Sequence, residues 1–144
     1  MNPPAVTLPC IPRRWQRLIV IGGGLAVFLW LRLEDHGVVP AIIMGLILAG
    51  LALIAWLWPR LANRPLKPGR LVLLVALSGV GLGLLTALAA AFLMLLKNGF
   101  HGHLNPDYPA GVILDTLVRA PIWALAGGLL AAALTLVWLA ARSR

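Results

Sequence analysis

The chain has 144 residues, of which 61% are hydrophobic and 11% are charged, and its formal net charge is +8. Ordinary globular domains are about 45–50% apolar and about 25% charged, so this composition excludes a typical soluble domain and indicates an integral membrane protein. The basic residues lie between long apolar runs and not on a polar, aromatic-rich surface, which excludes a nucleic-acid-binding protein. A single cysteine, Cys10, excludes an internal disulfide.

The chain begins with a basic, proline-rich segment, residues 1–17, which we expect to lie outside the membrane as a tail. A short apolar run follows at residues 18–33, flanked by Arg17 and Arg32, whose long side chains could extend the span into the interface. A basic stretch before a short apolar run also fits a cleaved signal peptide, but no small-residue cleavage site follows. We therefore favour a retained first transmembrane helix.

Three further apolar runs are long enough to cross a membrane. A helix needs about 20 apolar residues to span a hydrocarbon core about 30 Å thick, and residues 38–58, 71–96 and 120–141 meet this requirement without an internal charge. A short basic loop, 59–70, joins the second run to the third, and a longer loop, 97–119, joins the third to the fourth. The sequence predicts one all-α membrane domain, residues 1–144, with four transmembrane helices in an antiparallel bundle.

The charges between the spans predict the orientation of the chain. Most lysines and arginines lie in the N-terminal tail, the 59–70 loop and the C-terminal end, whereas every acidic residue and every histidine falls in the other connections. Because cytoplasmic loops carry an excess of lysine and arginine, both termini are expected to be cytoplasmic. We expect a multi-pass protein of a bacterial-type inner membrane.

Small residues recur every four positions along the spans. Such stripes let helix backbones approach closely in lipid, where helices gain nothing by escaping water. The stripes of the third and fourth spans predict that these helices pack together; their members are Gly79, Gly83 and Ala87, and Ala124, Gly128 and Ala132.

The loop before the fourth span contains a short amphipathic segment. A helical wheel over residues 109–120 places Asp115, Thr116 and Arg119 on one side and the larger apolar residues on the other. Pro121 would kink a helix that continued through it, so we expect a break there. The pattern predicts a short interfacial helix ahead of the last span.

Two histidines in the same loop form a candidate metal site. In an extended segment residues two apart point the same way, so His101 and His103 could both reach one ion. Asp107, or His36 from the first connection, could complete a zinc or copper site.

An ordinary loop explains the same residues without a metal. In this alternative, Lys97, Asn98 and Gly99 end the third helix as a C-cap, and "NPDYP" forms a turn. The histidines could equally belong to a surface that docks a partner or senses pH.

The expected function follows from what the spans contain. Their interiors hold no ionisable residue, only Ser78, Thr86 and Thr135 are polar there, and no catalytic constellation is visible, so we do not expect an enzyme. The favoured hypothesis is an accessory or assembly subunit of a larger respiratory or photosynthetic membrane complex, with lipid and either other membrane subunits or further copies as partners. A metal-handling or metal-sensing membrane protein is the alternative, and a small oligomeric channel or carrier is the third.

Overall fold

The computed structural model describes residues 6–7, 11–33, 37–101 and 106–142, and in these ranges the chain is almost entirely helical. Four of the helices are long and apolar enough to cross a membrane, as the sequence predicts. The elements in chain order are β1 (Val6–Thr7), α1 (Arg13–Arg32), α2 (Val38–Leu61), β2 (Pro65–Leu66), α3 (Pro68–His101), α4 (Ala110–Val118) and α5 (Ala120–Arg142).

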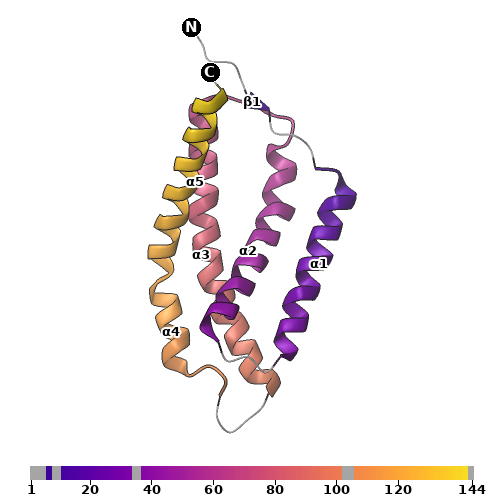
Figure 1. The fold of residues 1–144 in the computed structure, drawn as a ribbon, viewed down its shortest axis with the longest axis vertical. Coiled ribbons are helices and arrows are strands. Elements are labelled where there is room, and N and C mark those ends of the chain that lie inside the picture. Colours follow the sequence, from indigo (N-terminus) through magenta and orange to yellow (C-terminus); the bar gives the residue numbers. More distant parts are fainter. Residues whose placement is uncertain (1–5, 8–10, 34–36, 102–105, 143–144) are drawn as a thin grey trace.

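The long helices lie side by side, and successive ones run in opposite directions (Figure 1). One end of the molecule holds β1, the start of α1 and the end of α5, and we call it the basic end because Arg13 and Arg142 lie there. The opposite end holds α4, the end of α1 and the end of α3. α3 lies between α2 and α5, whereas α1 packs chiefly against α2.

Glycines allow α3 to touch the backbone of α5. A Cβ atom added to Gly79 would lie 2.6 Å from the Cβ of Ala131, and one added to Gly83 would lie 2.8 Å from the amide nitrogen of Ala124. On the other side of α3, a Cβ added to Gly45 of α2 would lie 2.7 Å from the carbonyl oxygen of Thr86. Close backbone approach at small residues therefore holds α2, α3 and α5 together.

The other small residues of the predicted stripes take different positions. Ala87 is fully buried, and Ala124 is almost so. Gly128 faces the Val80 side chain, whereas Ala132 is only partly buried. The sequence stripe missed Gly127, whose added Cβ would meet the backbone of Gly79. The α5 surface nearest α3 is thus rotated slightly from the predicted one.

Several helix boundaries differ from the prediction. α1 begins at Arg13, inside the predicted tail of residues 1–17, and α3 begins at Pro68 instead of residue 71. α3 continues to His101, so the C-cap expected at Lys97–Gly99 is wrong and these residues are helical. α2 runs two residues past Pro59, which lies in its last turn. Proline has no N–H to donate to the carbonyl of Ala55, one turn earlier, and only two helical residues follow it.

The short helix before the last span is present as α4, and the expected break follows it at Arg119. α4 nevertheless lies beside α3, in line with α5 (Figure 1). Its buried residues are Ile113 and Thr116, whereas Leu114 is exposed. The wheel placed Thr116 on the polar side; its hydroxyl instead donates to the carbonyl of Val112 at 2.9 Å, which allows it to face the core.

The N-terminal segment is tied to the loop between α2 and α3. Val6 and Thr7 of β1 pair in antiparallel fashion with Leu66 and Pro65 of β2. Val6 and Leu66 are both buried and pack against Leu71 at the start of α3. The proline-rich tail is therefore anchored at this point by two residue pairs and a small apolar cluster.

Candidate functional site

The structure brings together two of the predicted metal ligands. Nδ1 of His101, in the last turn of α3, lies 2.5 Å from Oδ2 of Asp107, and the Asp107 side chain is only 4% exposed. His36 and His103 lie outside the described residues. Among the residues that are described, no group of three histidine, cysteine or acidic side chains gathers at one point.

The His101–Asp107 geometry defines the role that each residue could take in a metal site. The carboxylate occupies Nδ1, so Nε2 is the ring nitrogen that would face an ion. Histidine ligands commonly bond a carboxylate through the other ring nitrogen in this way, which fixes the tautomer and the direction of the ring. In this arrangement Asp107 is placed to orient His101.

Lys97 lies one turn before His101, and its side chain is fully buried. Its ammonium nitrogen is 4.5 Å from the centre of the Trp30 ring on α1 and 5.9 Å from the centre of the Tyr108 ring. Aromatic faces carry negative charge density that attracts a cation, and the attraction is strongest where water is excluded. The two rings thus provide part of the environment that lets a charged residue lie inside the protein.

Asn98 fixes the chain segment that follows α3. Its side-chain Nδ2 donates to the carbonyl of Tyr108 at 2.8 Å, and its Oδ1 accepts from the amide of Tyr108 at 2.9 Å. The hydroxyl of Tyr108 donates to the carbonyl of Gly37 at 3.0 Å, and Gly37 is the N-cap of α2. These bonds join α3, the segment before α4 and the start of α2.

We call these side chains the Lys97 cluster, defined as Trp30, Lys97, Asn98, His101, Asp107 and Tyr108. Its members come from α1, α3 and the segment before α4, and Tyr108 extends it to α2. Nε1 of Trp30 is buried with no hydrogen-bond partner among the described residues. The side chains of His101 and Asp107 contact each other, whereas those of Asn98 and Tyr108 bond to backbone groups of other segments. The evident physical effect of the cluster is therefore to hold this end of the molecule together.

The sequence prediction placed Lys97 at the end of a helix and missed its burial. The helical periodicity of the sequence indicates the burial of Lys97. Ala90, Met94 and Lys97 follow one another at intervals of four and three, and Ala90 and Met94 are fully buried. Lys97 therefore continues the core-facing stripe of α3 by one more turn.

Comparisons of this chain with protein-family models, with curated proteins and with solved structures found no match. Function is therefore inferred from the residues themselves.

Proposed function

We propose that the protein is a non-catalytic accessory or assembly subunit of a larger membrane complex. The observation that supports this role is the contrast between the two kinds of surface. Lys97 is fully buried and the Asp107 side chain is only 4% exposed, so these ionisable groups are withdrawn from the surface. The outward faces of the helices are instead rows of large apolar side chains, a surface that other helices or lipid can cover.

Most residues of α1 are exposed. Its buried residues, Val27, Trp30 and Leu31, all lie in its last two turns. Earlier in the helix, Leu25 is 55% exposed, and Cβ atoms added to Gly22 or Gly24 would meet nothing within 4 Å. Exposed small residues between larger apolar ones allow a second helix to approach closely, so α1 is our proposed contact for a partner subunit.

The proposed orientation places the basic end in the cytoplasm of a bacterial-type cell, with the Lys97 cluster on the outer side of the inner membrane. Arg60 stacks on Trp56 with 4.3 Å between the guanidinium carbon and the ring centre, and Arg142 stacks on Trp138 at the same distance. Tryptophan is enriched at membrane interfaces, and arginine is enriched on the cytoplasmic side. These pairs support a cytoplasmic interface at the ends of α2 and α5.

A photo-crosslinking residue placed at Leu25 tests the role of α1. We expect irradiation of native membranes to attach a foreign membrane protein to this position. The matched control is the same residue at Met94, which is fully buried and should give no foreign product. Crosslinks from position 25 that contain only lipid or a second copy of the chain would contradict the proposal.

The His101–Asp107 pair favours a second candidate function, metal handling. With Nε2 of His101 as one ligand, His103 and His36 are the further ligands that the sequence offers. Protein purified without chelator should then hold zinc or copper in a fixed ratio, and the His101→Ala/His103→Ala variant should lose it. Equal, background metal content in the two proteins would eliminate this candidate.

A further inference from the structure

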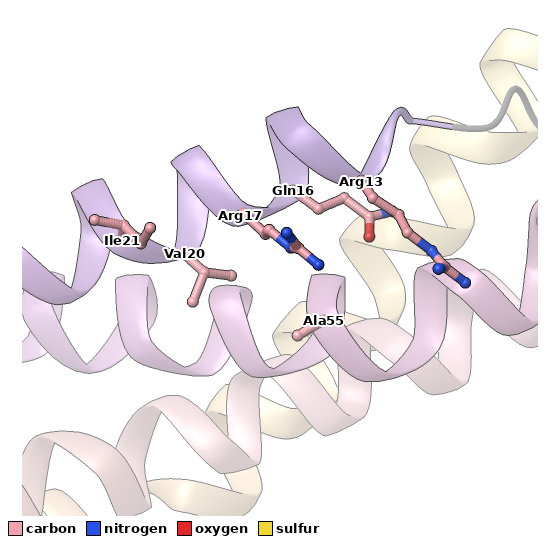
Figure 2. Close-up of a pocket in the computed structure, with 6 residues that line it drawn as sticks. All are labelled: Arg13, Gln16, Arg17, Val20, Ile21 and Ala55. Carbon is pink, nitrogen blue, oxygen red and sulfur yellow. The ribbon is translucent and has the colours of Figure 1, made fainter.

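A groove between α1 and α2 at the basic end combines cationic and apolar side chains. It has a volume of 310 Å³ and is lined by Arg13, Gln16, Arg17, Val20, Ile21 and Ala55. Figure 2 shows Arg13, Gln16 and Arg17 extending from α1 toward α2, with Val20 further along α1 and Ala55 opposite on α2. The polar side chains therefore occupy the end of the groove near the helix terminus, and apolar ones occupy its inner part.

The two helices diverge toward this groove from a point of close contact. A Cβ atom added to Gly23 of α1 would lie 2.6 Å from Cδ1 of Leu51 on α2, so the helices touch there. Two turns nearer the helix terminus, the side chains of Arg13, Gln16 and Arg17 line an open space instead. From Arg13 to Ile21 the lining spans about 12 Å along α1, because each helical residue rises about 1.5 Å.

The positive charges at this end of the molecule favour the binding of an anion. Arg13, Arg14 and Arg17 lie in the first two turns of α1, where no acidic residue is present in the first turn and no side chain caps the helix. A helix N-terminus carries partial positive charge, so arginines there repel it and an anion is favoured. The acidic residues that the structure describes, Asp107 and Asp115, belong to the opposite end of the molecule.

We propose that this groove binds an anionic phospholipid. The guanidinium groups of Arg13 and Arg17 bind the phosphate, since arginine presents donors in a fork that matches phosphate oxygens. The Gln16 side chain faces the rest of the headgroup, and one acyl chain follows Val20 and Ala55 toward the membrane core. A soluble phosphate would use the arginines but would leave the apolar half of the groove without a ligand.

The proposal does not depend on the accessory role, because it concerns only the lipid beside α1 and α2. It is tested with the full chain in a neutral detergent, titrated with phosphatidylglycerol or phosphatidylcholine while bound lipid is counted by native mass spectrometry. We expect one phosphatidylglycerol to bind saturably and phosphatidylcholine to bind about 10-fold more weakly. Equal affinity for the two lipids, or no saturable binding, would overturn the proposal.

Two variants separate the charge from the shape of the groove. Arg13→Gln/Arg17→Gln should weaken phosphatidylglycerol binding about 10-fold or more, as expected from the loss of charge-assisted hydrogen bonds. Its matched control, Arg14→Gln/Arg64→Gln, removes the same charge outside the groove lining and should leave the affinity unchanged. Ala55→Trp should block binding without changing any charge. Circular dichroism verifies that each variant is folded.

Two further results would overturn the assignment. If the control double variant weakens binding as much as the groove variant, the lipid responds only to net charge. If 10-fold excess inorganic phosphate displaces the lipid completely and Ala55→Trp binds normally, the groove is a phosphate site without a role for the acyl chain.

Discussion

The contact between α3 and α5 should be sensitive to a single methyl group at Gly83. In the Gly83→Ala variant the added Cβ would lie 2.5 Å from the carbonyl carbon of Trp123 and 2.8 Å from the amide nitrogen of Ala124. Carbon atoms pack at about 3.5–4.0 Å, so the two helices must separate by about 1 Å at this crossing. Because the opposing atoms belong to the backbone, no change of side-chain rotamer can relieve the overlap.

The size of the effect is best measured against Gly81→Ala in the same helix. A Cβ at Gly81 would meet nothing within 4 Å. Replacing glycine by alanine inside a helix stabilises it by about 0.5–1 kcal/mol, and this gain is common to both variants. Overpacking costs about 1–3 kcal/mol, so we expect Gly83→Ala to be less stable than Gly81→Ala by that amount.

The assay is reversible unfolding in mixed micelles with an increasing fraction of sodium dodecyl sulfate, followed by far-ultraviolet circular dichroism. Both variants have the same composition, so detergent binding to the unfolded chain should be equal. A Gly83→Ala protein as stable as Gly81→Ala would refute the inference that backbone contact at this residue holds α3 and α5 together.

Three other substitutions test separate parts of the fold. Lys97→Met should lower the free energy of unfolding by about 1–2 kcal/mol, because the cation–aromatic contacts are lost. Lys67→Met, on the exposed loop, should change this free energy little. Equal effects of the two substitutions would contradict the burial of Lys97. Asn98→Ala should cost about 1–3 kcal/mol because it removes both bonds to the Tyr108 backbone, and an unfolding curve that matches the wild type would count against this clamp. Val6→Asp should release the N-terminal segment. We expect faster protease cleavage before α1 and an unchanged unfolding midpoint. An unaltered cleavage rate would show that the β1–β2 pairing does not hold the tail.

The sequence was sufficient to predict the helices because each depends on local features. Long uncharged runs predict three of the candidate spans, and a shorter run flanked by arginines predicts the first. A proline two residues after Arg119 predicts the break between α4 and α5. Both the uncharged interior of a span and the position of a proline can be identified from neighbouring residues in the sequence. No knowledge of distant partners is needed to interpret them.

The Lys97 cluster could not be predicted in the same way. Hydropathy assigns a lysine after an apolar run to the boundary, because an isolated ammonium group is costly to bury. The rings of Trp30 and Tyr108 help to stabilise the buried ammonium group of Lys97. Trp30 lies far from Lys97 in the sequence, and Tyr108 follows it after the end of α3. The His101–Asp107 contact likewise depends on the path of the chain after α3, which residue spacing alone does not determine.

The N-terminal segment shows a third limit of the sequence prediction. Its prolines predicted a tail without helix. They did not predict that Val6 pairs with Leu66, which lies 60 positions later in the chain. A two-residue strand has no period that a pattern can detect. Only the closeness of the helix ends at the basic end brings the two segments together.

The central claim, that the chain is a subunit of a larger assembly, is tested most directly by gentle extraction from its native membrane, followed by sizing and protein identification on the same particle. We predict that the chain migrates with foreign membrane subunits in a fixed ratio and that this ratio survives repeated sizing. Migration as a monomer, or as an oligomer that contains only this chain, would contradict the proposed role.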